Sequence, residues 1–375
     1  MRTRRIGVKK LVLLLITILI SLPVTGVSAA PDGPPLISAE TAALIDVASG
    51  RIIAEKQGDK RMRIASLTKI MTAIVALEEG NSQEIVTTPP GAYAKEGSSI
   101  YLKRGEKMKM EDMLYGLMLR SGNDAAVAIA EHVGGSVDGF ARMMNEKAQY
   151  IGMRSSHFTN PHGLDDSDNH YSTTNDMALL TAYALRNPEF QKIVSTQVKH
   201  IPWEGEQWDR KLLNKNKMLR LYEGADGVKT GYTKIAKRCL SSSATRNGQQ
   251  LAIVVLNAPQ DWNDSMSWMD YGFANYPLTN LIQEKTRLGE EKQDNGVLAY
   301  YSTRAFSYPL AAGEKKQVSA RIVRNIQQPY AELTLRGDVI GRVPLALVQE
   351  TFVQAVEHRF AANWERFWQV LLGGV

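Results

Sequence analysis

The sequence predicts an α+β protein, in which a region of mixed helices and strands precedes a smaller β-rich region. Strand-like runs at 42–47 and 51–55 surround Ser49-Gly50, which indicates a β-hairpin. Residues 66–79 are apolar at helical spacing, which indicates a helix. Beyond about residue 288 the chain changes to short alternating runs such as 331–335, which are typical of a small β-domain.

Further elements follow along the chain. Apolar spacing predicts helices at 111–120 and 123–132, and a short β-branched run predicts a buried strand at 251–256. Residues 155–175 are polar and lack periodicity, so we expect a long loop there, and long ordered loops are often functional. Residues 289–295 are polar as well, and we expect a linker at that point.

The composition is that of a folded protein whose mature part is nearly neutral. The 375 residues leave room for two or three domains, and the 44% hydrophobic and 22% charged residues exclude wholesale disorder. The formal net charge is +6, but the first 29 residues contain five basic residues and no acid, which leaves about +1. We therefore expect no nucleic-acid partner. The single cysteine, Cys239, excludes an intramolecular disulfide and a Cys-based zinc site.

The N-terminal residues 1–29 resemble a secretory signal peptide. A basic start precedes the apolar run 11–20, and Val27-Ser28-Ala29 has the small-x-small pattern of a cleavage site. The alternative is an uncleaved membrane anchor, but the apolar run is short for a span, so we expect cleavage after Ala29 or Ala30. Both interpretations place the folded part outside the cytoplasm, as an exported protein.

Three short motifs contain the candidate catalytic residues, and the first is Ser66-x-x-Lys69. Residues three apart share one face of a helix, so the Lys69 amine can reach the Ser66 hydroxyl. A desolvated lysine can lose its own proton near neutral pH and accept that of the serine. By itself the pattern is weak, because an N-cap serine followed by an exposed lysine has the same sequence.

The second motif is Ser121-Gly122-Asn123. The Ser121 hydroxyl could pass a proton to a leaving nitrogen, and the Asn123 amide could orient a substrate carbonyl. Ser167-Asp168-Asn169 matches the S-D-N form more literally, but it lies in the polar loop. We prefer Ser121, which joins two predicted helices and so has rigid support.

The third motif is Lys229-Thr230-Gly231, followed by Tyr232. Lys229 offers a fixed cation to a terminal carboxylate, and Thr230 adds a hydroxyl for the same anion. Gly231 lets a substrate backbone approach an edge strand closely. This tripeptide is the most specific of the three motifs, because a given tripeptide arises by chance in only about 5% of chains of this length.

In this order and spacing, the motifs are those of penicillin-binding proteins and class A β-lactamases. From about residue 36 to the C-terminus the chain resembles the low-molecular-mass penicillin-binding proteins that are serine-type D-alanyl-D-alanine carboxypeptidases. The stretches that carry the likeness are Ser121–Ala125, Asn160–Leu164, Asp176–Ala178 and Asp226–Thr233. The resemblance implies an antiparallel sheet with helices, a helical subdomain, and removal of the terminal D-alanine from peptidoglycan stem peptides. β-Lactams would be covalent inhibitors, and no cofactor or metal is expected.

The resemblance also implies residue roles. Ser66 would be the acylated nucleophile, Lys69 its general base and Ser121 a proton relay. Asn123 would hold the peptide carbonyl of the substrate. The backbone N–H groups of Ser66 and Tyr232 would form the oxyanion hole.

Substrate binding would depend on the strand motif. Lys229 and Thr230 would bind the D-Ala carboxylate, next to Gly231. One departure follows, because the family often has Ala-Gly-aromatic-Cys where this chain has Ala236-Lys237-Arg238-Cys239. That departure leaves open how the strand end packs and whether its extra positive charge serves the substrate.

Two other functions stay open at this level. A β-lactamase would use the same nucleophile with a carboxylate to activate water, and Asp165, Asp166 and Asp168 are candidates in the loop. The long β-rich region argues against it. A non-catalytic β-lactam-binding module is the second alternative, which intact Ser66 and Lys69 disfavour. No metal-binding spacing accompanies the histidines of the loop, and Cys239 has no assigned base.

The C-terminus is predicted to be an amphipathic helix that lies on a membrane surface. One apolar stripe recurs at steps of three and four: Phe352, Val356, Phe360, Trp364, Phe367 and Leu371. The alternative is a helix packed on the β-domain of the protein itself. The predicted domains are therefore a signal peptide at 1–29, a D,D-peptidase domain at 36–280, a β-rich domain at 289–350 and an anchor helix at 351–375.

Overall fold

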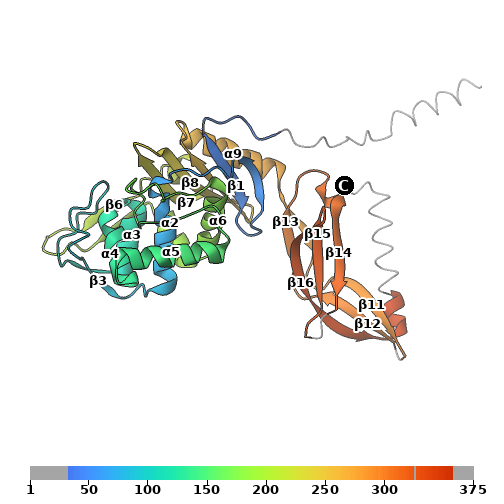
Figure 1. Cartoon of the computed structure of the whole chain (residues 1–375). Helices are drawn as coiled ribbons and strands as arrows, with labels where there is room; N and C mark the ends of the chain where they lie inside the picture. The colour runs from blue at the N-terminus through green and yellow to red at the C-terminus, as the bar shows by residue number, and fades with distance from the viewer. Residues whose placement is uncertain (1–32, 295, 325–326, 358–375) are drawn as a thin grey trace, which may run out of the picture.

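The computed structural model describes residues 33–294, 296–324 and 327–357. The predicted signal peptide and most of the predicted anchor helix lie outside these residues. Two bodies are visible, a larger one of helices around a sheet and a smaller one of long strands (Figure 1). The predicted α+β class is confirmed. The predicted domain limits stay a prediction.

The main sheet has five antiparallel strands in the order β2-β1-β9-β8-β7. The hairpin predicted near the start supplies the first two strands, and the apolar run at 251–256 lies within β9 in the middle of the sheet. β7, which contains the Lys229 motif, is an edge strand. The strands are β1 (Thr41–Asp46), β2 (Ile52–Lys56), β7 (Ala225–Thr233), β8 (Lys237–Arg246) and β9 (Gln249–Leu256).

Both faces of this sheet are covered because its strands alternate apolar side chains with period two. Leu44 and Ile253 point to one face, where they pack with Trp268 of α9 (Asp261–Asn275). Ile45 and Val254 point to the other face and join the core of the helical region. The helices of that region are α2 (Thr68–Glu79), α3 (Met110–Leu119), α4 (Asn123–Gly134), α5 (Val137–Ile151), α6 (Thr174–Leu185) and α7 (Pro188–Ser195).

Short elements complete this body and support the site. The three predicted helices form within two residues of the expected ends, and the first begins with a single 3₁₀ turn, η1 (Ala65–Leu67). Two small two-stranded sheets, β3-β4 and β5-β6, flank the helices. The short elements are β3 (Ile85–Thr87), β4 (Lys107–Lys109), β5 (Val198–Ile201), β6 (Arg210–Leu213) and α8 (Met218–Leu221).

The C-terminal body has a five-stranded antiparallel sheet in the order β11-β12-β16-β15-β14 and a two-stranded sheet, β10-β13. The expected linker at 289–295 is wrong, because β11 pairs with β12 there. β11 is an edge strand whose residues are all partly or fully exposed, so their polarity did not exclude pairing. The elements are β10 (Leu278–Ile282), β11 (Arg287–Gln293), β12 (Gly296–Ser302), β13 (Phe306–Pro309), η2 (Glu314–Gln317), β14 (Val318–Val323), β15 (Tyr330–Leu335) and β16 (Asp338–Glu350).

One arginine joins the two bodies. Arg51, after the β1–β2 turn, donates to both carboxylate oxygens of Glu314 at 2.8 and 2.9 Å and to the carbonyl of Pro309 at 2.6 Å. Its guanidinium also lies over the rings of Tyr276 and Tyr308. The pair is mostly buried, so this contact is a firm attachment between the β-hairpin and the C-terminal body.

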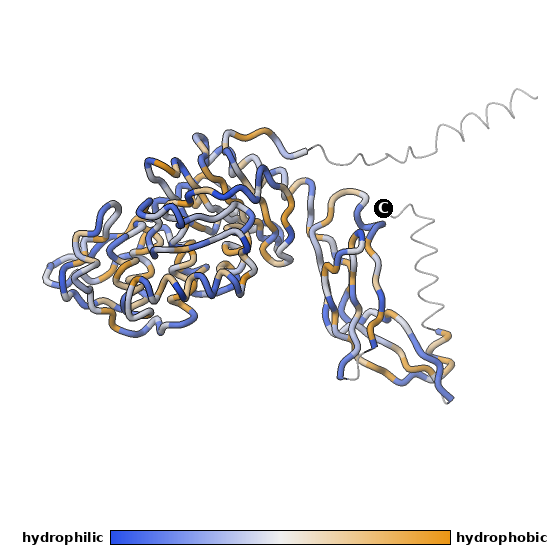
Figure 2. Tube along the Cα trace, in the orientation of Figure 1, coloured by the Kyte–Doolittle hydropathy of each residue, from blue (hydrophilic) through white to orange (hydrophobic). Residues whose placement is uncertain are grey.

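Apolar side chains gather where the described chain ends. Residues 352–357 are helical, and Figure 2 shows apolar positions around this end of the β-rich body. Five of them are 44–68% exposed, namely Leu347, Val348, Phe352, Val353 and Val356. Within the described parts of the chain, none of the helices is both long and apolar enough to cross a bilayer.

Candidate active site

Ser66 and Lys69 lie on one face at the start of α2, as the first motif predicts. Ser66 is in the 3₁₀ turn η1, and Lys69 follows in the first turn of the α-helix. The Lys69 Nζ lies 3.1 Å from the Ser66 Oγ. Ala65, just before the serine, has a φ of +48°, a left-handed conformation that costs a non-glycine residue about 1–3 kcal/mol. Strain of this kind typically marks a functional turn.

A buried histidine fixes this strained turn. The Thr68 Oγ1 donates to the carbonyl of Ala65 at 2.9 Å and lies 2.8 Å from the His170 Nε2. The His170 Nδ1 accepts from the backbone N–H of Thr159, so its proton is on Nε2 and donates to Thr68. Burial lowers the pKa of His170 to about 3, and nearby Arg63 contributes, so the ring is neutral. The sequence predicted only that His170 lies in the loop at 155–175, and it did not predict the contact with Thr68.

Lys69 is completely buried and has two further partners. Its Nζ lies 2.7 Å from the Asn123 Oδ1 and 2.6 Å from the backbone carbonyl of His162. Burial is the main cause that holds the Lys69 pKa well below its ordinary value of 10.5, and the charges of Lys229 and Lys215 lower it further. Sequence reasoning missed the His162 carbonyl as a site group. The Asn160 Oδ1 accepts from the backbone N–H groups of His162 and Gly163, and an asparagine that forms such a turn was the available signal.

Ser121 and Asn123 come from the junction between α3 and α4. Ser121 is buried with a φ of +64° and lines the same cavity as Ser66. Both polar atoms of the Asn123 amide have partners. The Oδ1 accepts from Lys69, and the Nδ2 donates to the carbonyl of Glu96 at 2.6 Å. Asn123 therefore holds Lys69, and its predicted contact with a substrate carbonyl stays a prediction. Asp124 orders the neighbouring loop by accepting from the backbone N–H of Ile100.

The alternative motif, Ser167-Asp168-Asn169, does not line the cavity that contains Ser66. Ser167 lines a different hollow, and Asp168 is exposed in an ion pair with Arg63. If Ser121 is the proton relay that the sequence predicts, Ser121→Ala should lower D-alanine release from a peptide substrate at least tenfold, because general acid–base groups contribute about 10²–10⁴-fold. Ser167→Ala, the matched control, should leave the rate unchanged. Steady-state assays of both variants measure this, and a larger loss in Ser167→Ala would contradict the choice of Ser121.

The third motif lies on the edge strand beside the serine. A Cβ on Gly231 would be 3.2 Å from the backbone nitrogen of Ser66, which is tighter than most Cβ contacts, so glycine lets β7 approach the nucleophile without a shift of the neighbouring backbone. Thr230 faces the cavity and Tyr232 is mostly exposed. Lys229 is buried, and burial, followed by the charge of Lys215, lowers its pKa to about 7.

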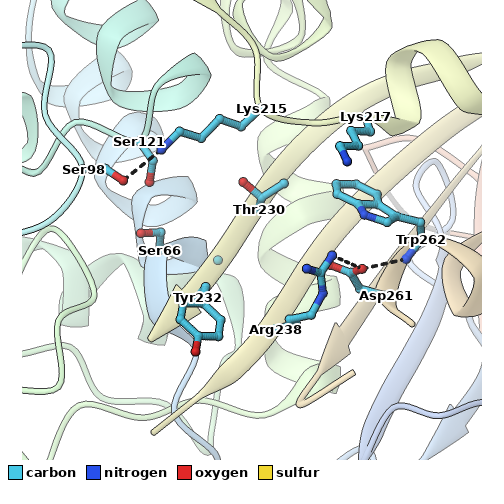
Figure 3. Close-up of a pocket in the computed structure, with 11 residues that line it drawn as sticks. Ser66, Ser98, Ser121, Lys215, Lys217, Thr230, Tyr232, Arg238, Asp261 and Trp262 are labelled. Atoms are coloured by element: carbon cyan, nitrogen blue, oxygen red, sulfur yellow. Dashed lines mark hydrogen bonds and ion pairs between the residues drawn. The ribbon is translucent and has the colours of Figure 1, made fainter. Parts of the chain in front are cut away.

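A cavity of about 350 Å³ opens onto Ser66. Figure 3 shows Ser66 and Ser121 at one side, Thr230 in the centre and Trp262 across the strand. Sequence reasoning missed five of its lining residues, which come from loops and elements distant in the chain: Ser98, Lys215, Lys217, Asp261 and Trp262. It noted Arg238 only as a departure from the family pattern. The loop aspartates at 165, 166 and 168 are not among the lining residues.

Two minor interpretations of the sequence are confirmed. Cys239 is fully buried, and burial raises the pKa of its thiol to about 12, so it behaves as a small apolar residue. His162 lies beside the site, where it presents its backbone carbonyl to Lys69 and its ring Nδ1 to the N–H of Leu164.

The chain is similar to known proteins over most of its length. Residues 27–260 match the family model of D-alanyl-D-alanine carboxypeptidase. The chain is 31% identical to D-alanyl-D-alanine carboxypeptidase DacF of Bacillus subtilis, over 88% of this chain and 90% of that protein. It is 32% identical to DacA of Haemophilus influenzae, over 83% of this chain and 81% of the relative.

The fold agrees with that likeness. The structure superposes on penicillin binding protein 5 of Haemophilus influenzae with a TM-score of 0.71 and 30% identity, covering 85% of this chain and 99% of the other. The Streptomyces K15 DD-transpeptidase aligns with a TM-score of 0.61 over 65% of this chain and all of its own, at 32% identity. The family model spans more than half of the sequence and the fold follows it, so this chain belongs to the serine D-alanyl-D-alanine carboxypeptidase family.

Proposed function

We propose that this protein removes the terminal D-alanine of peptidoglycan stem peptides through an acyl-enzyme on Ser66. The Ser66 Oγ attacks the carbonyl carbon of the penultimate D-Ala, the C–N bond breaks, and D-alanine leaves with a proton that Ser121 relays. Water then hydrolyses the ester. The backbone N–H groups of Ser66 and Tyr232 stabilise the oxyanion, typically by about 3–4 kcal/mol per donor. β-Lactams acylate the same serine.

The contacts of Lys69 are the observation that carries this proposal. A neutral amine has two N–H donors and one lone pair. The Asn123 Oδ1 and the His162 carbonyl can only accept, so they take the two N–H groups. The lone pair is left for the Ser66 hydroxyl at 3.1 Å, which is hydrogen-bond distance for a general base. The low pKa of Lys69 supports the neutral form that this role needs.

The test is release of D-alanine from diacetyl-Lys-D-Ala-D-Ala, with and without penicillin. We expect release that penicillin blocks with a single mass adduct on Ser66. Rapid steady turnover of nitrocefin would instead favour a β-lactamase, which the absence of the loop aspartates from the cavity lining disfavours. An adduct on Ser66 without any peptide turnover would favour a non-catalytic binding module.

Lys229 is proposed to bind the terminal carboxylate of the substrate together with Thr230. Lys229→Ala should weaken substrates with a free C-terminus by about 1.5–3 kcal/mol in kcat/KM, the usual contribution of a hydrogen bond to a charged group. A peptide amidated at its C-terminus should be poor already and nearly indifferent to the substitution. Kinetics on the two peptides measure this. An equal loss on both would show that Lys229 serves catalysis or folding instead.

We further propose that the enzyme acts outside the cytoplasm, held at the membrane by its C-terminus. Residues 1–29 support export, and the sequence stripe beginning at Phe352 supports an interfacial helix. The exposed apolar side chains that include Phe352, Val353 and Val356 are compatible with this arrangement. A surface-bound helix of this kind would hold Ser66 near newly made cell wall.

Truncation before Thr351 tests the anchor. We expect a soluble protein with unchanged activity on short peptides, because residues 351–357 follow the last strand and none of them lines the Ser66 cavity. The full mature chain should sediment with anionic liposomes and the truncated chain should not. Unfolding or loss of activity in the truncated protein would show that the stripe is core packing on the β-rich body.

A further inference from the structure

The Ser66 cavity continues beyond Thr230 into a hollow that the proposed D-alanine release does not use. Lys217 precedes α8, Arg238 is on β8 and Trp262 is in the first turn of α9. In Figure 3 these three side chains lie across Thr230 from Ser66. Three elements that carry residues 21 to 45 positions apart in the sequence thus converge on one side of the cavity. We refer to this side, lined by Lys217, Arg238 and Trp262, as the Lys217 subsite.

The charge around this subsite is unbalanced. Lys215, Lys217 and Arg238 line the cavity as cations, and Asp261 is the only carboxylate among the lining residues. Asp261 already accepts from Arg238 at 2.6 Å, while Lys215 donates to Ser98 at 2.9 Å. Among residues 33–294, 296–324 and 327–357, no hydrogen bond or ion pair involves the Lys217 ammonium. Two positive charges therefore exceed the local acid, and the subsite favours an anion.

The cavity also extends beyond Thr230. Its volume of about 350 Å³ reaches from Ser66 to Lys217 and Trp262. A leaving D-alanine has six non-hydrogen atoms, and its single carboxylate is assigned to the K-T-G motif. The Trp262 indole adds a flat apolar wall, on which the methylene groups of a longer side chain can pack.

We propose that the Lys217 subsite binds the leaving residue when that residue is larger than alanine and carries a second carboxylate on its side chain. The inference rests on the proposed function, because it uses the same acylation. The Ser66 Oγ bonds to the D-Ala carbonyl carbon, the C–N bond breaks, and the acidic residue departs as an amine with the relayed proton. Water then hydrolyses the ester.

Three peptides that differ only at the last residue test this proposal. We compare diacetyl-Lys-D-Ala-D-Ala with its D-Glu and D-Gln analogues, the last two matched in size and different in charge. The intact enzyme at low salt should show a three- to tenfold higher kcat/KM for D-Glu than for D-Gln. Lys217→Met should bring that ratio close to one. Lys211→Met removes an exposed lysine of β6 outside the lining and should keep the ratio.

The outcomes separate the two proposals. The ratio of two substrates on one enzyme preparation does not depend on how much of a variant folds, and 0.5 M salt should reduce the wild-type ratio without any substitution. If D-alanine is released but D-Glu is no better than D-Gln, or if the ratio survives in Lys217→Met, the subsite proposal is overturned and the carboxypeptidase function stands. If no peptide is cleaved, the function itself fails.

Discussion

Ser66→Ala is expected to abolish both D-alanine release and covalent labelling by penicillin. Without the Oγ no ester can form, so the rate should fall by about four orders of magnitude or more. The measurements are kinetics on diacetyl-Lys-D-Ala-D-Ala and intact mass after exposure to penicillin. The cavity and its cations remain, so weak non-covalent binding of the antibiotic should persist.

Folding and nucleophile identity are checked in the same samples. Within the described part of the chain, the Ser66 hydroxyl has one hydrogen-bond partner, Lys69, so the variant should lose no more than about 1–2 kcal/mol of unfolding free energy. A thermal melt close to that of the wild type would show that the lost activity is chemical. Penicillin labelling at another serine in the variant would show that this other serine is the nucleophile, and it would refute the proposed acyl-enzyme on Ser66.

Lys69→Ala is expected to remove acylation nearly as fully. The serine and its base act as one unit, so the double variant should be no slower than either single variant. Retention of more than about 1% of the acylation rate in Lys69→Ala would mean that another group takes the proton.

The same lysine sets the pH dependence of acylation. Below its pKa Lys69 is an ammonium without a lone pair, so the rate should fall about tenfold for each unit of pH, and above its pKa the rate should be flat. Because that pKa is held well below 10.5, the plateau should begin well below pH 10.5. Lys215→Met removes a positive charge that lowers the pKa of Lys69. The rising part of the pH–rate profile should therefore shift to higher pH in this variant and stay in place in Lys211→Met. An unshifted profile in Lys215→Met would contradict Lys69 as the titrating base.

The sequence by itself determined the chemistry of the centre and most of its local frame. The Ser66–Lys69 spacing places both groups on one helical face, because helix geometry is local. Ser121 lies at a junction between two helices and lines the same cavity as Ser66, whereas Ser167 of the polar loop lines a different hollow, and the role of Ser121 stays a prediction. The short apolar, β-branched run at 251–256 predicted the buried strand β9, but the half-exposed polar strand β11 gave no such contrast and was mistaken for a linker.

Tertiary structure decided everything that depends on distant segments. The His162 carbonyl, the neutral His170 behind Ala65 and the lining residues Lys217 and Trp262 come together only when loops from separate elements converge. The pKa of Lys69 is likewise not a property of its motif. It follows from complete burial and from the neighbouring cations, which no spacing in the sequence encodes.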